Sequence, residues 1–313
     1  MPVEIVIESP AMRRAVDLAE RGASAPTTTT LLVTGETGTG KDLIARHVHE
    51  LSGAAGPLVT IDCASLPETL LESELFGHER GAYTGATDAR AGRLEAARGG
   101  TLVLDEIAAM APPAQAKFLR LLDERRFTRL GGSRAIELDA RVIALTNVDL
   151  ALATGTGAFR ADLFFRLNVV AIELPPLREQ PAAIAPLAEL FARRFAHAAR
   201  AGARIVRPDA LRVLERYSFP GNARELRSAI EQAVVRGNGR QINAADLPER
   251  IRDGAPAGES GRPTLAEVEA AYVRSVLEEV GGNKSLAARV LGISRKNLYE
   301  RLRRGVSPGG GAK

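Results

Sequence analysis

Residues 31–43 read Leu31-Leu32-Val33-Thr34-Gly35-Glu36-Thr37-Gly38-Thr39-Gly40-Lys41-Asp42-Leu43, an apolar run that passes through a glycine-rich turn into a helical pattern. A strand, a turn and a helix in this order let backbone N–H groups converge on phosphate oxygens at the helix N-terminus, where Lys41 can neutralise their charge. The residues predicted to hold a nucleotide here are Gly35, Glu36, Thr37, Gly38, Thr39, Gly40, Lys41 and Asp42.

A second apolar run, Leu102-Val103-Leu104, is followed directly by Asp105 and Glu106. Ligands of open α/β sheets bind at the carboxyl ends of the strands, so these acids would meet the phosphates there. Asp105 would hold Mg²⁺ through water, and Glu106 would orient or deprotonate the attacking water. Either motif alone could be a plain turn. Their combination favours an ATPase with ATP and Mg²⁺ as cofactors.

Three further polar residues are candidates for the same chemistry. Asn147 follows the strand pattern of residues 141–145 and could hydrogen-bond the γ-phosphate or the attacking water, although a simple strand-terminal turn explains it equally well. Arg160 and Arg166 are spaced along a predicted helix. They could stabilise phosphoryl charge if they reach a neighbouring subunit's site, and the alternative is surface salt bridging.

The order of the predicted elements indicates an α/β protein with an all-helical second part. Five β-rich runs alternate with helical stretches, which predicts a parallel sheet covered by helices. The runs are residues 31–33, 58–61, 101–104, 141–145 and 169–172. From Pro181 to Arg252 the pattern is entirely helical and predicts a lid. A linker without apolar anchors follows, then three amphipathic helices within residues 264–304 and a tail predicted to be disordered.

The 313 residues allow two or three folded units, and 45% hydrophobic with 26% charged residues is typical of a globular protein. A net charge of +4 is too small for indiscriminate nucleic-acid binding. Cys63 is the only cysteine and the four histidines form no metal-ligand spacing, so a reducing cytoplasm fits. No apolar run is long enough to span a membrane and no signal peptide opens the chain, so we expect a soluble cytoplasmic protein.

The C-terminal end has the charge and spacing of a DNA-binding helix-turn-helix. From residue 284 onward there are eight basic residues and a single acid. Predicted helices at residues 283–291 and 294–304 are separated by Gly292, and Leu298 and Leu302 would face the core. The residues predicted to contact DNA are Asn283, Ser294, Arg295, Asn297, Arg301 and Arg303.

Residues 74–86 read Glu-Leu-Phe-Gly-His-Glu-Arg-Gly-Ala-Tyr-Thr-Gly-Ala, a segment that ATP chemistry does not require. The segment resembles the signature loop of bacterial enhancer-binding proteins, the AAA+ activators of sigma-54 RNA polymerase. Residues 282–302 resemble the Fis-type helix-turn-helix that ends most members. Further similarity lies at residues 63–67, 160–168, 174–179 and 219–226, so the resemblance covers roughly residues 8–250 and then the C-terminal end.

The resemblance implies a P-loop AAA+ domain over residues 1–178, a helical lid over 179–252, a linker over 253–263, the helix-turn-helix over 264–304 and a tail over 305–313. It implies a sigma-54-dependent activator that binds enhancer DNA as dimers and opens the closed promoter complex as a ring, usually a hexamer. Lys41, Asp105 and Glu106 would come from one subunit, with Asn147 as sensor one and Arg224 as sensor two. Arg160 and Arg166 would come from the neighbour.

Two loops would face the polymerase on this resemblance. The sigma-contact loop consists of Gly81, Ala82, Tyr83, Thr84, Gly85 and Ala86. A second loop, residues 127–136, would move with it. An exposed aromatic between glycines is typical of a contact surface, and an aromatic packed into its own domain is the alternative.

One residue departs from the general P-loop pattern and three depart from the family pattern. Asp42 replaces the usual Ser or Thr of a P-loop and leaves open how magnesium is held. Tyr83 replaces Phe, and Phe219 replaces Trp. Asp62 stands where many members have Asn, and we expect an acid there to repel Glu106.

Two other functions remain open from the sequence. One is a DNA-binding repressor whose ATPase controls assembly, and the other is an AAA+ remodeller of a different substrate. Because almost no chain precedes Pro10, we expect no amino-terminal receiver domain, and activity that is constitutive or restrained by a separate protein acting in trans.

Overall fold

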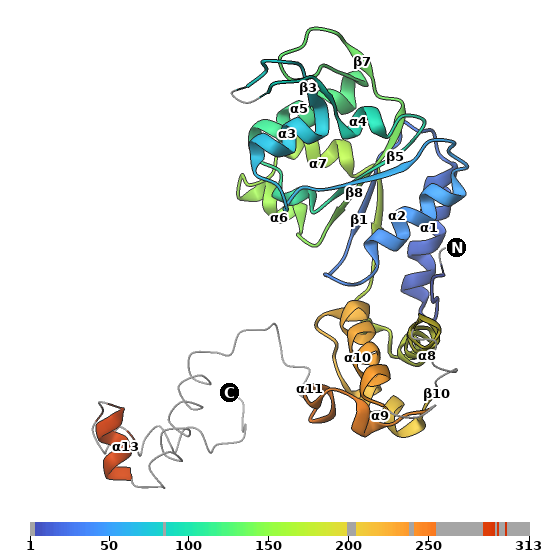
Figure 1. Cartoon of the computed structure of the whole chain (residues 1–313), viewed down its shortest axis with the longest axis vertical. Coiled ribbons are helices and arrows are strands. Elements are labelled where there is room, and N and C mark those ends of the chain that lie inside the picture. The colour runs from blue at the N-terminus through green and yellow to red at the C-terminus, as the bar shows by residue number, and fades with distance from the viewer. Residues whose placement is uncertain are drawn as a thin grey trace, which may run out of the picture. The chain divides into compact units, whose positions relative to one another are not determined.

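A five-stranded parallel sheet forms the centre of the first unit, in the order β2-β5-β8-β1-β9 (Figure 1). The computed structural model describes residues 4–83, 86–198, 205–237, 241–254, 284–291, 293 and 298. The chain divides into two units, Met1–Ala257 and Gly258–Lys313. The strands are β1 (Leu31–Thr34), β2 (Leu58–Asp62), β5 (Gly100–Asp105), β8 (Ala140–Thr146) and β9 (Val170–Glu173). Every pairing is parallel, as the alternation of strands and helices predicts.

Both faces of the sheet are covered by helices, because alternate residues of each strand point to opposite sides. On one face Leu31 and Val33 pack against α1 (Pro10–Ser24) and α2 (Lys41–Leu51). On the other face Leu32, Leu102 and Leu104 lie in a second core with residues of five helices. These are α3 (Glu68–Phe76), α4 (Arg93–Ala96), α5 (Pro112–Glu124), α6 (Leu150–Gly155) and α7 (Ala161–Leu167).

Two short hairpins extend from this second layer, at the top of Figure 1. The first pairs β3 (Gly77–His78) with β4 (Arg90–Ala91) and carries the sigma-contact loop. The second pairs β6 (Arg126–Phe127) with β7 (Ile136–Glu137) and carries the second loop. A 3-10 turn, η1 (Ile107–Ala109), joins β5 to α5.

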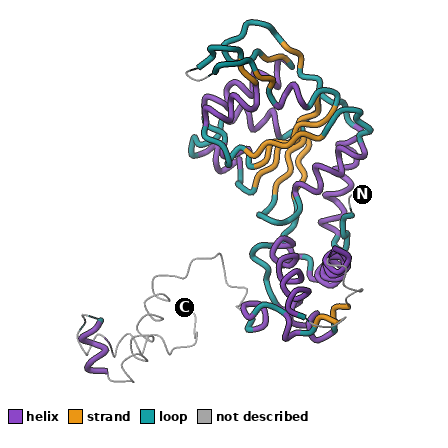
Figure 2. The backbone as a smooth tube through the Cα atoms, in the orientation of Figure 1, coloured by secondary structure: helices purple, strands orange, loops and turns teal. Residues whose placement is uncertain are grey.

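A separate hydrophobic core holds the lid together. It is built on α8 (Pro181–Ala198), α9 (Pro208–Arg216), α10 (Asn222–Arg236) and α11 (Glu249–Arg252), with the 3-10 turn η2 (Leu177–Glu179). A further 3-10 turn, η3 (Ala244–Asp246), precedes α11. The expectation of an entirely helical lid is wrong in one detail. β10 (Ile205–Val206) and β11 (Gln241–Ile242) form a parallel pair, seen as the orange strands low in Figure 2, and two-residue strands are too short to show an alternating pattern.

In the second unit the structure describes α13 (Lys284–Val290) and a few residues after it. Ala287, Ala288 and Leu298 are buried together, so Leu298 faces a core as predicted. The predicted helix before α13, Leu302 and the tail lie outside the described residues. No helix in the described ranges has the length and apolar character needed to cross a membrane.

Candidate functional site

The glycine-rich loop lies between the carboxyl end of β1 and the start of α2. Gly35, Gly38 and Gly40 have φ values of 144°, 82° and 100°, a backbone region that side chains with a Cβ rarely adopt. The Lys41 ammonium is buried inside the loop and donates to the carbonyl oxygens of Gly35 at 2.9 Å and Glu36 at 3.3 Å. Burial lowers the pKa of Lys41, while the charges of nearby Glu106 and Asp105 oppose that shift. The loop therefore concentrates positive charge and backbone donors at the helix start.

The paired acids lie at the carboxyl end of β5. Asp105 is half-buried, and its carboxylate accepts from the Glu106 backbone N–H at 3.0 Å. Burial raises the pKa of Asp105. Glu106 has a φ of 49°, a left-handed conformation that costs on the order of 1–3 kcal/mol for a residue with a side chain. Such strain is frequent at functional sites, and sequence patterns carry no signal for it.

Asn147 lies between the loop and the acids because β8, which it follows, is the strand between β1 and β5. Its side-chain amide donates to the Thr37 hydroxyl at 2.9 Å, and its backbone N–H lies 3.4 Å from a Glu106 carboxylate oxygen. A γ-phosphate held by the loop would meet the polar groups of Asn147, Lys41 and Glu106 at this point.

The two unusual acids near the site have different surroundings. Asp42 is exposed on the first turn of α2, and among the described residues its carboxylate makes no hydrogen bond or ion pair. Asp62 is in register with Asp105 across the sheet, and its carboxylate accepts from the Ala64 N–H at 2.9 Å. After burial, the charge of Asp62 is one of the causes that raise the pKa of Asp105. Asp62 thus lies beside Asp105 in the sheet, and the expected repulsion of Glu106 stays a prediction.

The lid contacts the P-loop at the start of α10. A Cβ added to Gly38 would lie 2.3 Å from the Gly221 carbonyl oxygen and 2.9 Å from the Arg224 Cβ. Arg224 thus lies beside the phosphate loop, on an exposed face. The Glu36 carboxylate bonds to two lid-side residues, Arg178 and Asn222. Sequence reasoning did not single out these two partners.

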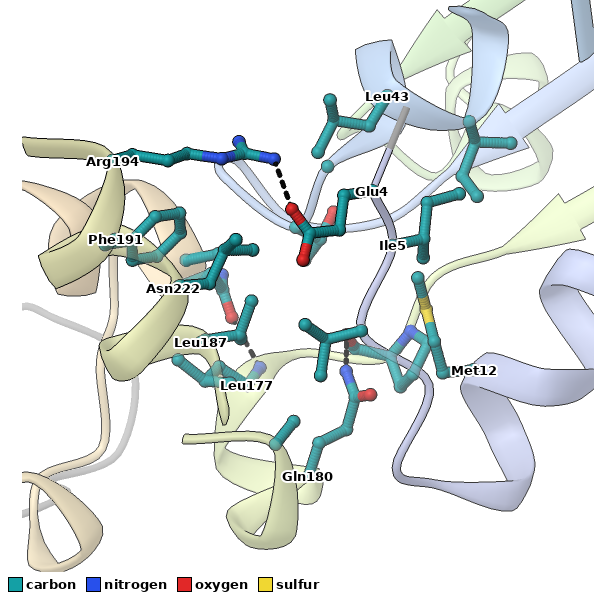
Figure 3. A pocket seen from close by; sticks show the side chains of 18 residues that line it. Glu4, Ile5, Met12, Leu43, Leu177, Gln180, Leu187, Phe191, Arg194 and Asn222 are labelled. Carbon is teal, nitrogen blue, oxygen red and sulfur yellow. Dashed lines mark hydrogen bonds and ion pairs between the residues drawn. The ribbon is translucent and has the colours of Figure 1, made fainter. Parts of the chain in front are cut away.

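An apolar cavity of about 80 Å³ lies next to the P-loop, between the N-terminal segment, α2 and the lid (Figure 3). Its walls include Ile5, Met12, Leu43, Leu187 and Phe191. At its rim Glu4 pairs with Arg194 at 3.1 Å. Sequence reasoning also missed this cavity, although the apolar residues Ile5, Val6 and Ile7 before α1 were a signal for a partly buried segment.

Phe219, where Trp is usual, is fully buried in the lid core. Its ring lies edge-on to Tyr217 with centroids 5.0 Å apart. The smaller ring is thus accommodated by packing inside the lid.

Arg160 and Arg166 lie at the two ends of α7. Arg160 is exposed and pairs with Asp162 at 2.7 Å, while Arg166 pairs with Asp123 at 3.0 Å and donates to the Leu122 carbonyl at 2.8 Å. In the part of the chain that the structure describes, neither guanidinium bonds to the P-loop or the paired acids. Their role at the site of a neighbouring copy stays a prediction.

The sigma-contact loop closes with a small set of bonds. Gly81, with φ 80°, donates its N–H to the Ala86 carbonyl at 2.9 Å. Thr84 and Gly85 lie outside the described residues. Tyr83 is 43% exposed, and its ring lies edge-on to His78 at 5.2 Å between centroids. Its hydroxyl is 3.5 Å from the Ser73 Oγ, so the ring is both exposed and packed against its own domain.

The second loop is bonded to the base of the hairpin that carries the sigma-contact loop. The Leu130 N–H donates to Gly77, and the Leu130 carbonyl accepts from the Glu79 N–H, both at 2.9 Å. Arg129 pairs with Glu79 at 3.2 Å and with Glu95 at 2.8 Å. These contacts join the two hairpins into one structural body.

The predicted DNA contacts Asn283, Ser294, Arg295, Asn297, Arg301 and Arg303 all lie outside the described residues.

Family models match nearly the whole chain. A sigma-54 interaction domain matches residues 5–173, an AAA+ ATPase lid domain residues 178–263, and a bacterial regulatory protein domain of the Fis family residues 264–305. The chain is 46% identical over 303 residues to the transcriptional regulatory protein ZraR of Escherichia coli K12, covering 96% of this chain and 68% of ZraR. It is 44% identical over 317 residues to the regulatory protein AtoC of the same strain, covering 97% and 68%.

Solved structures of NtrX from Brucella abortus are also similar. The complex with ADP has a TM-score of 0.73 at 34% identity and covers 98% of this chain and 70% of NtrX. The complex with ATP has the same TM-score and identity and covers 97% and 69%.

Proposed function

Because the chain belongs to the family of sigma-54-dependent transcriptional activators, with an AAA+ ATPase domain and a Fis-type helix-turn-helix, we propose that it opens the closed promoter complex by ATP hydrolysis in an oligomeric ring. The observation that carries this proposal is the Asn147 bridge between Thr37 and Glu106, within the same unit as the two joined loops. The proposal thus assigns nucleotide chemistry and partner contact to the same unit.

The proposed chemistry assigns one task to each polar group. Lys41 and the backbone N–H groups of the P-loop hold the β- and γ-phosphates, and Glu106 takes the proton of the attacking water. Asn147 orients that water against the γ-phosphate. Arg224 adds positive charge from the lid, and Arg160 and Arg166 supply it from a neighbouring copy.

Magnesium fits the donor groups of this site. One Asp105 oxygen accepts from the Glu106 N–H, and carboxylate oxygens with waters are the surroundings that Mg²⁺ prefers. We assign Asp105 to hold the ion through water, with the exposed carboxylate of Asp42 nearby in place of a hydroxyl. When bound, the ion neutralises phosphate charge.

The apolar cavity is the proposed site of the base. It adjoins Thr39 and Gly40 of the P-loop, so a nucleotide whose phosphates lie in the loop can direct its base there. Phe191 of α8 offers a flat aromatic ring and Leu187 an aliphatic side chain, and the base would link the lid to the α/β layer.

Movement would pass from the acids to the loops through two helices. α3 follows β2, whose last residue is in register with Asp105, and α5 follows Glu106 after η1. Lys117 of α5 pairs with Glu72 of α3 at 2.5 Å. α3 leads into the sigma-contact loop and α5 into the second loop, so a shift at the acids would reach both loops together.

Sigma-54 and DNA are the partners that the family's two interaction domains imply. We further propose assembly of dimers into a ring, with Arg160 and Arg166 reaching across the subunit boundary. A DNA-bound regulator acts where the chromosome lies, so we place it in the bacterial cytoplasm. We also propose that a separate protein controls the activity of this chain in trans.

The test measures ATP hydrolysis per subunit against protein concentration, together with open-complex formation on a sigma-54 promoter. Wild type, Glu106→Ala and Tyr83→Ala are compared. We expect activity to rise with assembly, Glu106→Ala to abolish it, and Tyr83→Ala to keep hydrolysis while losing open complexes. Normal promoter opening by Tyr83→Ala would refute the loop assignment and favour a DNA-binding repressor or another substrate.

A further inference from the structure

Asn222, the first residue of α10, combines complete burial with a left-handed backbone. Its exposure is 0% and its φ is 52°. Asn tolerates this region better than most residues with a side chain, but a buried amide must be hydrogen-bonded to be stable. The backbone N–H donates to the Phe219 carbonyl at 2.7 Å, which fixes the turn that begins the helix.

The Asn222 side chain bonds to three separate parts of the molecule. Its Oδ1 accepts from the Leu177 N–H at 2.7 Å, in the segment that enters the lid. Its Nδ2 donates to a Glu36 carboxylate oxygen and to the Thr37 carbonyl, both at 3.1 Å. One amide therefore ties the P-loop, the connection to the lid and the start of α10 together.

Glu36 is held from a second direction by Arg178. The two side chains form a bidentate pair at 2.6 and 2.8 Å. The hydrogen bond from Arg178 lowers the pKa of Glu36, so this carboxylate stays charged at neutral pH. Both of its oxygens are occupied by lid-side groups, and Glu36 is therefore directed to the lid.

Thr37 receives a bond from each side of the site. Its hydroxyl accepts from Asn147, which follows β8, and its carbonyl accepts from Asn222 of the lid. Arg224 lies two residues after Asn222 on the same first turn, where its Cβ is within van der Waals reach of Gly38. A shift of Asn222 against the P-loop would thus displace Arg224 as well.

We propose that Asn222, supported by Glu36 and Arg178, is a positioning residue that sets Arg224 against the phosphate loop. The inference rests on the proposed function, specifically on Arg224 contacting the phosphates. On this proposal Asn222 links the P-loop to the lid, so nucleotide bound in the loop determines the position of Arg224.

The test is a double-mutant cycle on ATP hydrolysis by the full chain. Asn222→Gly removes the side chain while glycine accepts the φ of 52° without strain. Because misplacing a catalytic group costs about 10- to 100-fold, we expect Asn222→Gly and Arg224→Ala to lower kcat/KM by similar factors in that range. The double variant should be no worse than Arg224→Ala alone. Glu231→Gln, exposed on the same helix, is the matched control.

Each outcome of the cycle has one meaning. Losses that multiply in the double variant, or wild-type activity of Asn222→Gly, would overturn the inference and leave the proposed function standing. Wild-type activity of Arg224→Ala would remove the lid arginine from the proposed site, and the inference with it.

A second variant covers the case in which Asn222→Gly does not fold. Glu36→Gln keeps an acceptor for Asn222 but removes the charge that holds Arg178. We expect a smaller loss of kcat/KM that again vanishes in the Arg224→Ala background, with the variant still folded at the assay temperature. A loss of kcat/KM that persists in the Arg224→Ala background would contradict the proposed link between P-loop and lid.

Discussion

The side-chain amide of Asn147 lies 2.9 Å from the hydroxyl oxygen of Thr37, so the strand between the P-loop and the acids is bonded to the P-loop itself. The same residue reaches Glu106 through its backbone N–H at 3.4 Å. Phosphoryl transfer depends mainly on positioning and on charge stabilisation. Because Asn147 is bonded to the P-loop and to Glu106, a change at the γ-phosphate can alter the position of Glu106 through it.

Glu106→Gln should abolish hydrolysis while ATP still binds. The amide cannot accept the proton of the attacking water, and loss of a general base costs about 10²- to 10⁴-fold in rate. Phosphate release measures the rate, and a fluorescent-nucleotide titration measures binding. Glu189→Gln, exposed on α8, serves as control. Hydrolysis at the wild-type rate in Glu106→Gln would assign the base to another residue.

Tyr83→Phe should open promoters nearly as well as wild type, whereas Tyr83→Ala should not. The ring lies edge-on to His78 and is 43% exposed, and Phe preserves both features. The hydroxyl is 3.5 Å from the Ser73 Oγ, at the limit of a hydrogen bond, so its removal costs little. Open-complex footprinting at equal ATPase activity measures the difference. Failure of Tyr83→Phe would show that the hydroxyl itself contacts the partner.

Arg129→Gln should uncouple the two loops without affecting the ATP site. It removes the ion pairs to Glu79 and Glu95, whose N–O distances are 3.2 and 2.8 Å, while the backbone bonds of Leu130 remain. We expect unchanged hydrolysis and reduced binding of sigma-54 in a pull-down with ATP bound. Arg126→Gln, in the exposed pair with Glu137, is the control. Equal sigma-54 binding by both variants would contradict the coupling.

Much of the fold follows from short patterns in the sequence. The five strand runs were predictable because buried parallel strands are nearly continuous apolar segments, as Leu102-Val103-Leu104 illustrates. β10 and β11 were not, because strands of two residues have no period. The loop glycines and the two acids could be placed at the sheet edge because the carboxyl ends of parallel strands meet there.

The parts of the site that were not predicted from the sequence depend on contacts between residues far apart in the chain. Asn222 and Glu36 are separated by 186 residues, and no local pattern joins them. The apolar cavity forms only when α8 is placed against the N-terminal segment. The left-handed backbone of Glu106 is likewise imposed by tertiary structure, since Glu has no preference for that region.

Stability should depend on Glu36 in the acid range. The Arg178 bond holds the folded pKa of Glu36 below its ordinary value of 4.5, so its stabilising contribution is complete above that value. The contribution is lost as the pH falls through the folded pKa. The free energy of unfolding of wild type should therefore fall more steeply below about pH 4.5 than that of Glu36→Gln. Denaturant titrations at several pH values measure both, and parallel curves would contradict the prediction.

Phe191→Ala should weaken ATP binding without slowing the hydrolysis of bound ATP. Phe191 lines the apolar cavity, where contact with a base is the same in ground and transition states, so KM rises while kcat stays constant. Losing on the order of 1 kcal/mol of apolar contact raises KM about fivefold. Phe195→Ala removes the same ring one turn later on α8, outside the cavity wall, and should leave KM unchanged. An equal rise in KM for both variants would mean that the ring acts through lid stability, and the base would then bind elsewhere.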